Sequence, residues 1–479
     1  MGSGPGSADG PRSLDDGSSY TAIAKDLDMD NATFTTPDLT TFCHLDDLGL
    51  TVTGQHLGPQ RATLLGRPTG LDDWCHRCGC HGQVRDSVVR ELARVPFGWR
   101  PTTLQVRLRR YQCTGCGHVW RQDLTRAASP RSCLSRGALR WALEALVVNH
   151  LSMTRIAAAL GVAWNTANDA VLAEGQRMLI DSPGRLDGVS VVGVDEHVWR
   201  HTRRGDKYVT VVIDLTPVST GTGASRLLAM VEGRSKQAFK TWLAEQPQTW
   251  RDGVKIVAMD GFTGFKTAAA EELPKAATVM DPFHVIRLAG DALDVCRRRV
   301  QVSLHGSRGR KHHPLYQARR TLHTGADLLT DKQQRRLNAL FADDRHVEVE
   351  ATWGVYQAMI TAYRTKARSD GKKALARLID SIGSAVPTRL VEVCKLGRTL
   401  TKRRDDILAF FDHTGTSNGP TEAINGRLEH LRGTALGFRN LTHYIARSLL
   451  EAGGVQTPTT PSIVKSRVRF RSPLSSPPM

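Results

Sequence analysis

Two closely spaced cysteine pairs constrain the fold of this chain more than any other feature. Cys75-His-Arg-Cys78 and Cys113-Thr-Gly-Cys116 are separated by residues 79–112. A Cys-x2-Cys turn presents two thiolates from one tight loop, and two such turns supply the four tetrahedral ligands of a structural zinc ion. The sequence therefore predicts one structural Zn²⁺ held by these four cysteines, in a zinc ribbon with a long hairpin.

The chain between the two cysteine turns supports a hairpin. Residues 88–95 and 103–111 are strand-like, and Arg107, Arg109 and Arg110 project from the second segment. The separation of the two turns is longer than in the commonest zinc ribbons, so nearby side chains are alternative ligands. These alternatives are Cys80, His76, His81 and His118.

Composition narrows the classes of protein. The 479 residues are 40% hydrophobic, enough for folded cores, and the nine cysteines are an odd number, which argues against a disulfide framework. The first residues, Met-Gly-Ser-Gly-Pro, lack the apolar core of a signal peptide. No apolar run approaches the roughly 18 residues of a transmembrane helix. We therefore expect a cytoplasmic protein with no membrane partner.

The formal net charge of +18 predicts a polyanionic partner, with nucleic acid foremost. The first forty residues run against this balance, because they hold seven Asp and only Arg12 and Lys25. Basic clusters lie further along the chain and are expected to contact DNA phosphates, although a solvated helix face is the alternative. The clusters are Arg297-Arg-Arg, Arg308-Gly-Arg-Lys-His-His, Lys402-Arg-Arg, and Arg427, Arg432 and Arg439.

Residues 154–171 have the pattern of a helix-turn-helix. Ala157 is small where two helices must approach, and Gly161 lies at the turn. Asn can pair with adenine in the major groove, and Thr can contact base edges or phosphate. We therefore predict DNA contacts from the exposed side of the second helix, with an ordinary helical hairpin as the alternative. The predicted contact residues are Trp164, Asn165, Thr166 and Asn168.

Short β-branched runs followed by helical segments predict a mixed α/β sheet after residue 185. Asp195 ends the run 189–195, and Asp260 ends the run 254–260. A carboxylate at the tip of each of two buried strands can hold a divalent metal, because the apolar strand sets its position and the acid meets solvent. From about residue 283 to 412 the chain is mostly helical and Arg-rich.

A third carboxylate can come from the segment Ser417-Asn-Gly-Pro-Thr-Glu-Ala-Ile-Asn-Gly-Arg. Ser417 or Asn418 can cap a helix that Pro420 starts. Glu422, Asn425 and Glu429 then share one helix face. Hard oxygen ligands suit Mg²⁺ or Mn²⁺, and two such ions about 4 Å apart support phosphodiester chemistry.

These motifs together make the chain resemble the ISL-three family of bacterial insertion-sequence transposases, over roughly residues 41–452. The last motif, with Gly437-Phe-Arg-Asn after it, is the most specific. The motifs that carry the resemblance are the cysteine turns, the helix-turn-helix, Val192-Val-Gly-Val-Asp-Glu-His, Asp281-Pro-Phe-His-Val and the segment that begins at Ser417.

The resemblance implies an RNase H-like catalytic core with an Asp-Asp-Glu triad. By motif position, Asp195 is the first acid, Asp260 the second and Glu422 the third, and together they would bind two Mg²⁺ or Mn²⁺ ions. The helical stretch after Asp281 would be an insertion between the second and third acids.

Three assignments stay open within this reading. Asp281 follows the strand-like residues 277–280 and is a rival for Asp260, although it can instead orient His284 or cap the next helix. Asp214 ends the second strand and can approach the metals or serve in a turn. Glu429 is a weaker rival to Glu422.

The predicted fold class is therefore multidomain α/β: a zinc ribbon and a helix-turn-helix, then an RNase H-like mixed-sheet core interrupted by a helical insertion. The predicted divisions are a disordered acidic leader (1–40), a zinc-ribbon DNA-binding domain (41–128), a helix-turn-helix domain (129–182), the first part of the catalytic core (185–300), a basic helical insertion (301–404), the third-acid helix of the core (405–452) and a disordered tail (453–479).

The predicted function is that of a DNA transposase. It would bind the inverted repeats of its insertion sequence, cleave the DNA with Mg²⁺ and join the ends to target DNA. Two ends must be held together, so we expect a homodimer or a higher oligomer on DNA, associated with the nucleoid. The alternatives are a zinc-ribbon and helix-turn-helix transcription regulator without catalysis, and a nuclease or resolvase without strand transfer.

Overall fold

The computed structural model describes residues 38–202, 206–435 and 437–454, and the chain divides into two compact units between residues 136 and 137. In this described part, no helix has both the length and the apolar character needed to cross a membrane. Each unit has its own hydrophobic cores.

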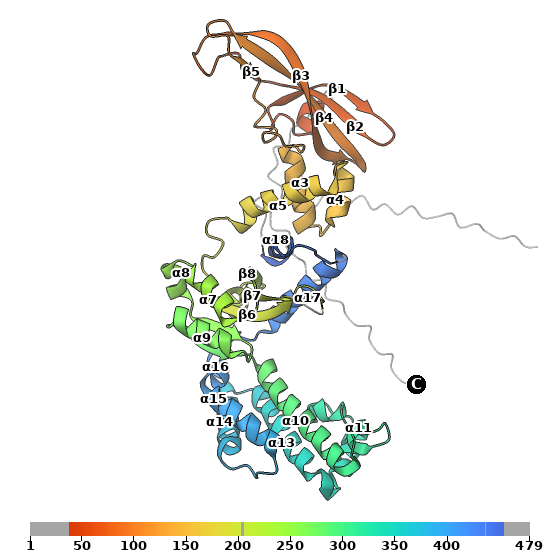
Figure 1. Ribbon diagram of the computed structural model, residues 1–479, viewed down its shortest axis with the longest axis vertical. Helices are drawn as coiled ribbons and strands as arrows, with labels where there is room; N and C mark the ends of the chain where they lie inside the picture. The colour runs from red at the N-terminus through yellow and green to blue at the C-terminus, as the bar shows by residue number, and fades with distance from the viewer. Residues whose placement is uncertain (1–37, 203–205, 436, 455–479) are drawn as a thin grey trace, which may run out of the picture. The chain divides into compact units, whose positions relative to one another are not determined.

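The first unit is built on a sheet with strand order β1-β2-β4-β3, and β5 pairs with the end of β4. Figure 1 shows β3 and β4 as a long hairpin. The two predicted strand segments lie within β3 and β4, whereas β1 and β2 were missed. The elements are α2 (Leu39–Phe42), β1 (Leu50–Leu57), β2 (Ala62–Pro68), β3 (Gly82–Phe97), β4 (Arg100–Cys113) and β5 (Val119–Arg121).

Alternation along β4 explains why it forms the centre of this sheet. Val106 and Leu108 are buried in the core, while Arg107 and Arg109 between them point to solvent. Arg110, also predicted to project from this strand, instead forms an ion pair with Asp86 on β3. The β4 strand of the hairpin therefore has one apolar face, which packs against the core, and one basic face, which is exposed to solvent.

The second unit begins with helices, and α4 and α5 span most of the segment 154–171 that the sequence predicts to be helical. The side chain of Ser152 accepts from Arg155 N (3.4 Å) and caps α4, and Gly161 ends α4 with a left-handed φ of 65°. The elements are α3 (Arg136–Val147), α4 (Met153–Leu160), α5 (Trp164–Gly175) and the π-helix η1 (Gln176–Ile180).

A mixed sheet with strand order β10-β9-β6-β7-β8 follows these helices. β6, β7 and β8 are antiparallel neighbours, whereas β9 and β10 run parallel to β6. This arrangement confirms the predicted mixed α/β sheet. The strands are β6 (Val191–Val198), β7 (Tyr208–Asp214), β8 (Arg226–Glu232), β9 (Ile256–Met259) and β10 (Ala277–Met280).

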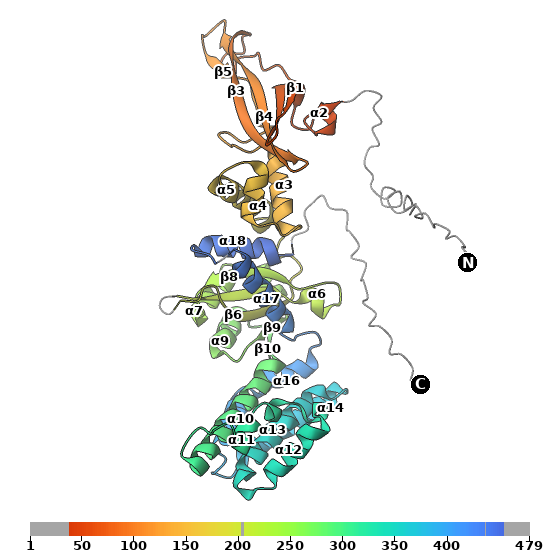
Figure 2. The ribbon, with the colours of Figure 1, turned by 90° about the vertical axis from the view of Figure 1, so that its right-hand side faces the viewer.

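Helices cover both faces of this sheet (Figure 2). One face packs on Phe239 of α7 and Phe265 of α9. The other packs on Ile424 of α17 and Tyr444 of α18, which come from the far end of the chain. The covering helices are α7 (Lys236–Ala244), α9 (Thr263–Glu272), α17 (Gly419–Thr434) and α18 (Leu441–Ala452).

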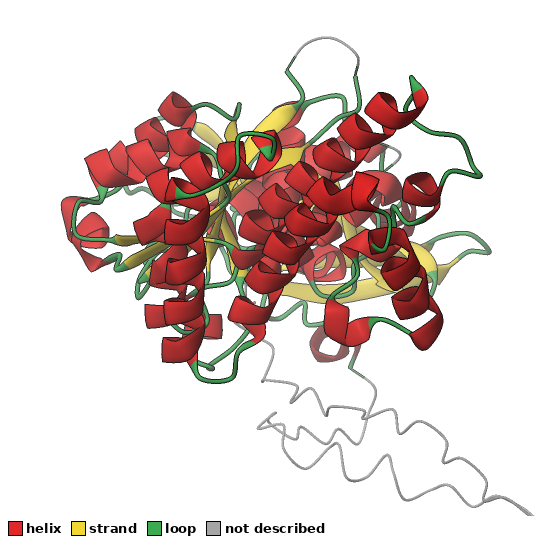
Figure 3. Cartoon of the chain, turned by 90° about the horizontal axis from the view of Figure 1, so that it is seen from below, coloured by secondary structure: helices red, strands yellow, loops and turns green. Residues whose placement is uncertain are grey.

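The chain between β10 and α17 is helical and has one core of its own, from Met280 to Phe411 (Figure 3). α10 (Pro282–His305) is continuous, so the helical part begins directly after β10. The remaining helices are α11 (Pro314–Gln317), α12 (Asp331–Phe341), α13 (Val347–Arg364), α14 (Arg368–Ser384), α15 (Val391–Lys402) and α16 (Arg404–Asp412), with short 3-10 turns between them.

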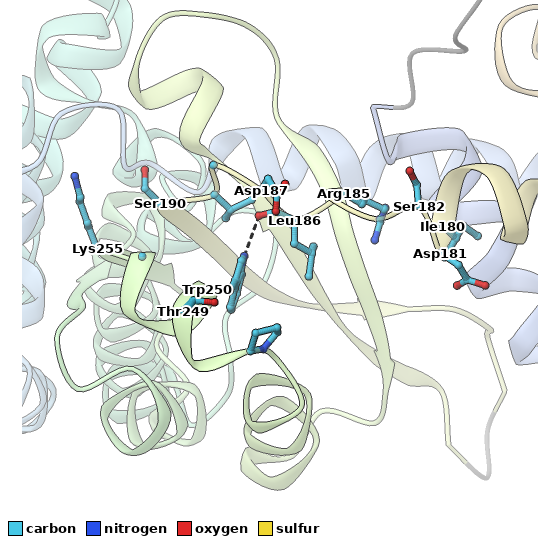
Figure 4. Close-up of a pocket in the computed structure, with 15 residues that line it drawn as sticks. Ile180, Asp181, Ser182, Arg185, Leu186, Asp187, Ser190, Thr249, Trp250 and Lys255 are labelled. Carbon is cyan, nitrogen blue, oxygen red and sulfur yellow. Dashed lines mark hydrogen bonds between the residues drawn. The ribbon is translucent and has the colours of Figure 1, made fainter.

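A hollow of about 730 Å³ lies beside the segment that leads into β6 (Figure 4). Its walls come from residues 180–190 and from the chain around α8 (Gln248–Gly253). Trp250 Nε1 donates to Leu186 O (3.0 Å) and ties the two walls together. None of its lining residues is a predicted acid of the catalytic core, so this hollow is separate from the site described below.

Candidate active site

Asp195 and Asp260 lie side by side at one edge of the mixed sheet. β6 and β9 are parallel and pair Val194 with Met259, and an acid follows each of these residues. Asp260 comes directly after β9, whereas β6 continues past Asp195 to Val198. Glu196 N donates to Asp195 Oδ1 (2.8 Å), and Phe262 N donates to Asp260 Oδ1 (2.8 Å). The backbone therefore holds both carboxylates in place.

The two carboxylates repel each other in a poorly solvated place. Burial, together with the nearby charge of Asp260, raises the pKa of Asp195 to about 6. Burial also raises the pKa of Asp260. Such a pair is poised to accept a positive charge.

His284 is the third member of this cluster. Its ring and the two carboxylates each offer a ligand atom, and these atoms all lie within 4.8 Å of one another. The carboxylate of Asp281 beside the ring raises the pKa of His284, and Asp195 and Asp260 add to this effect. The sequence pattern indicated His284 only as a partner of Asp281. Its place in the first turn of a helix that follows a strand was the signal for a role at the site.

Asp281 is a structural residue in this arrangement. It is 1% exposed and caps α10, since its Oδ2 accepts from Phe283 N (3.0 Å) and His284 N (3.4 Å). Its Oδ1 accepts from Asn418 N (2.7 Å) at the start of α17, and from the hydroxyl of Ser417 (3.3 Å). These contacts agree with the alternative in which Asp281 caps the next helix. Both carboxylate oxygens of Asp281 accept hydrogen bonds.

α17 crosses the same edge of the sheet and brings Asn425 to the first acid. Asn425 Nδ2 donates to Asp195 Oδ2 (3.1 Å), and Asn425 Oδ1 is buried without a hydrogen-bond partner. The helix begins at Gly419, one residue before the predicted start at Pro420, with Asn418 at the N-cap position. The Asn418 side chain accepts from the Thr421 hydroxyl and caps no backbone N–H. Asn418 thus joins α17 to Asp281 through its backbone.

Glu422 lies on the first turn of α17, three residues before Asn425 and on the same helix face. It is exposed, and in the described part of the chain it does not belong to the cluster of Asp195, Asp260 and His284. Glu429, one turn after Asn425, forms an ion pair with Arg432 and lies 4.0 Å from His197 Nε2. Among the residues that the structure describes, the Glu429 carboxylate is thus paired with Arg432, whereas the Glu422 carboxylate has no ion-pair partner.

Asp214 serves the turn after β7. It is 3% exposed, pairs with Arg226 (2.9 Å) and accepts from Thr216 N (2.9 Å). These contacts leave it engaged away from the acidic cluster and agree with the turn alternative.

The four predicted cysteines come together at the end of the β3–β4 hairpin. Cys75 Sγ lies 3.7 Å from Cys116 Sγ, and Cys78 Sγ lies 3.4 Å from Cys113 Sγ. A tetrahedral zinc site with Zn–S bonds of about 2.3 Å has sulfur–sulfur edges of about 3.8 Å, so the cluster has the size that zinc requires. Backbone N–H groups of Cys116 and Gly115 donate to Cys113 Sγ (3.3 Å each) and lower the pKa of this thiol to about 6. The alternative ligand Cys80 is exposed and outside the cluster.

A comparison with known protein families decides the class. A family profile described as a transposase, of the DDE type and the ISL-three group, matches residues 192–448, more than half of the chain. The chain belongs to this transposase family. As a DDE transposase it is a metal-dependent enzyme that cleaves and joins DNA, and the regulator alternative is not favoured.

Individual transposases are similar to this one over long stretches. The transposase for insertion sequence element IS1557 of Mycobacterium tuberculosis is 26% identical over 333 residues, which cover 65% of this chain and 70% of that protein. The transposase for IS1001 of Bordetella parapertussis is 24% identical over 225 residues, 47% of this chain and 52% of that protein. A solved chain of the Drosophila P element transposase strand transfer complex matches 67% of this chain and 92% of its own, at 10% identity and a TM-score of 0.36.

The acidic cluster of the transposase fits a divalent metal. Its donors are two half-buried carboxylates with raised pKa values and an imidazole. Carboxylate and amide oxygens are the ligands that Mg²⁺ and Mn²⁺ prefer. A cation between Asp195 and Asp260 would offset the repulsion between the two carboxylates. The residues present therefore fit a divalent metal ion.

The predicted DNA-contact helix of the transposase is only partly exposed. Trp164 (46% exposed) and Asn165 point to solvent, and Thr166 is half-buried. The prediction that Asn168 lies on the exposed side is wrong, because it is 3% exposed and donates to Asp169 Oδ1 (3.1 Å). Asn168 lies in the same stripe as Val171, which forms the buried side of α5.

Several predicted basic contacts lie inside the helical part of the transposase. Arg297 is 6% exposed and pairs with Asp294, and Arg299 bridges Glu348 (2.7 Å) and Glu392 (2.8 Å). The prediction of phosphate contact is wrong for Arg297 and for Arg403, which pairs with Asp406, because both guanidinium groups are buried against acids. Arg299 is 38% exposed, and its phosphate contact stays a prediction. The exposed Lys and Arg members of the predicted clusters are Arg298, Arg308, Arg310, Lys311, Lys402, Arg427 and Arg439.

Proposed function

We propose that Asp195, Asp260 and Glu422 are the catalytic triad of an RNase H-like core that moves an insertion sequence. The observation that carries this proposal is the pair of carboxylates brought together by the parallel strands β6 and β9, Asp195 within β6 and Asp260 directly after β9, with Asn425 of α17 bonded to the first of them. Glu422 is one helical turn from that contact. The mixed sheet with three antiparallel and two parallel strands supports an RNase H-like core. The helical part between the second and third acids is then an insertion.

Two Mg²⁺ or Mn²⁺ ions at this site would activate the attacking oxygen and stabilise the leaving oxygen. Asp195 and Asp260 would hold the ions, since their backbone donors already fix both carboxylates. In the first step, a water oxygen bonds to phosphorus, the bond from phosphorus to the 3′ oxygen breaks, and that oxygen takes a proton. In the second, the oxygen of the new 3′ hydroxyl bonds to a target phosphorus and loses its proton, while the bond from that phosphorus to the target's own 3′ oxygen breaks and this oxygen takes a proton. No bond to the protein forms.

Recognition of DNA is proposed for the elements upstream of the core. α4 and α5 with the left-handed turn at Gly161 have the form of a helix-turn-helix, which would place Trp164 and Asn165 against DNA. The zinc ribbon, with Arg107 and Arg109 on its exposed face, would add phosphate contacts. Both ends of the element, its inverted repeats, must be held during strand transfer, so we propose a homodimer or larger assembly on DNA.

Glu422→Gln tests the third acid. The substitution keeps the shape of the side chain and removes its charge, so we expect plasmid excision to fall by roughly 10²–10³-fold while the protein still binds the ends of the element. Glu429→Gln is the matched control, because it lies on the same face of α17 but is paired with Arg432. Excision that falls with Glu429→Gln and survives Glu422→Gln would move the third acid to residue 429.

Asn165→Ala and Asn168→Ala separate base contact from packing. If Asn165 pairs with an adenine, its loss is expected to weaken binding to the element's own ends by about 1–3 kcal/mol and to change binding to unrelated DNA little.

Asn168→Ala is expected to lower the free energy of unfolding by about 1–2 kcal/mol, since the side chain is buried and hydrogen-bonded. Gel-shift titrations with both DNAs and urea unfolding measure the two effects. Equal losses on both DNAs for Asn165→Ala would indicate a phosphate contact instead.

A further inference from the structure

His284 is built into the active site by the fold of the chain around it. It lies in the first turn of α10, directly after β10, which pairs in parallel with β9. Its side chain is 18% exposed, and its ligand atom lies within 4.8 Å of those of Asp195 and Asp260. The cluster therefore combines two oxygen donors with one nitrogen donor.

A carboxylate stands behind the imidazole. His284 Nδ1 lies 3.5 Å from Asp281 Oδ2, and Asp281 is itself held by backbone N–H groups from α10 and from Asn418. Histidines that bind metals usually turn one ring nitrogen toward a carboxylate or carbonyl, which sets the ring orientation and leaves the other nitrogen for the ion. Asp281 Oδ2 faces His284 Nδ1 at ion-pair distance without a formed hydrogen bond between them. Asp281 is also 1% exposed, so solvent does not compete for this carboxylate.

We propose that His284 is a third protein ligand, through an imidazole nitrogen, of the divalent ion held by Asp195 and Asp260. The proposal rests on the proposed function of the acidic cluster and deepens it. Glu422, which lies outside this group, is then left for the second ion. An imidazole ligand suits a transition-metal ion better than Mg²⁺, which prefers oxygen. The site should therefore favour Mn²⁺ over Mg²⁺ more than an all-carboxylate site would.

Electron paramagnetic resonance of bound Mn²⁺ tests this ligand without relying on activity. The full-length, zinc-loaded protein is titrated with Mn²⁺ alone, and pulsed spectra are examined for the modulation that a directly bound imidazole ¹⁴N produces. We expect the modulation in the wild-type protein and its loss in both His284→Gln and His284→Ala. Mn²⁺ affinity should fall by about tenfold or more, and the preference for Mn²⁺ over Mg²⁺ should narrow.

His430→Gln is the matched control, because His430 is an exposed histidine on α17 that hydrogen-bonds within its own helix. It should keep the modulation and the affinity. Two substitutions at residue 284 are used so that the result does not depend on one change in packing, and thermal unfolding checks that both variants fold.

Two contrary outcomes have different meanings. If Asp195→Asn removes the bound Mn²⁺ but the ¹⁴N modulation is absent, or persists in both His284 variants, the proposal for His284 is wrong and the acidic metal site stands. If the wild-type protein has no Mn²⁺ site that Asp195→Asn removes, the metal site and the proposed function fail together.

Discussion

Asp195→Asn is expected to abolish DNA cleavage and strand transfer while making the metal-free fold more stable. The carboxylate lies beside Asp260 and near His284, so its loss removes a charge on which metal binding depends. We expect the rate of Mg²⁺-dependent cleavage of end DNA to fall by more than about 10³-fold. Binding to the ends, which uses other parts of the chain, should be retained.

The gain in stability follows from the raised pKa of Asp195. Its pKa is about 6 in the fold and 3.8 for an unperturbed side chain, so ionisation disfavours folding. The wild-type protein is penalised fully above pH 6, progressively less as the pH falls toward 4, and not at all below the unfolded value. The neutral Asn escapes this penalty of about 2–3 kcal/mol near pH 8. Asn425 can turn its amide over and offer its free Oδ1 to the new side chain.

Urea unfolding without added Mg²⁺ or Mn²⁺, at pH 8 and at pH 4.5, measures this difference. The variant should be more stable at pH 8, and most of the advantage should vanish at pH 4.5. Asp291→Asn, on an exposed part of α10, is the control and should change neither stability nor cleavage. Cleavage at the wild-type rate by Asp195→Asn would refute the proposed mechanism.

Cys113→Ser is expected to release the zinc ion and unfold the end of the β3–β4 hairpin. Cys113 is buried against Tyr111, Trp120 and Cys75, a small cluster that the metal would hold together. Structural zinc contributes on the order of 10 kcal/mol in small zinc modules, far more than these few apolar contacts can supply. The core around Leu104 is separate from this cluster, so the rest of the sheet should remain folded.

Elemental analysis should show about one zinc per chain in the wild-type protein and almost none in Cys113→Ser. Emission from Trp120 should change as its surroundings open, and binding to the element's ends should weaken. Cys80→Ser is the matched control, because Cys80 is a neighbouring but exposed cysteine outside the cluster. Unchanged zinc content in Cys113→Ser would place the ion elsewhere in the chain.

The features that the sequence predicted well are those set by local order along the chain. Cysteine turns, the acid directly after β9, and a proline in the first turn of a helix each depend on a few consecutive residues. The prediction that Asp195 ends its strand is wrong, because β6 continues to Val198. The strands β1 and β2 were missed because each contains a glycine, β2 has few β-branched residues, and half of the residues of β1 face solvent, so the apolar strand pattern is weak.

The errors concern which neighbour each side chain meets. Asn168 follows Asn165 on a polar stretch, yet it faces the buried side of α5. Arg297 and Arg299 form a basic run in the sequence, but α10 turns them toward acids on its own turn, on α13 and on α15. The burial and ion pairing of a side chain depend on elements that are distant in the chain, and the local sequence does not show which elements these are.

By itself, the sequence determined the classes of chemistry: four thiolates for zinc, acids at strand ends for a divalent ion, and a basic surface for DNA. Only the tertiary structure decided which groups meet. Parallel pairing of β6 with β9 brings Asp195 to Asp260, α10 adds His284, and α17 sets Asn425 on Asp195. The physical reason is that a metal site is defined by distances of a few ångströms, and these arise from sheet register and helix packing between residues far apart in the chain.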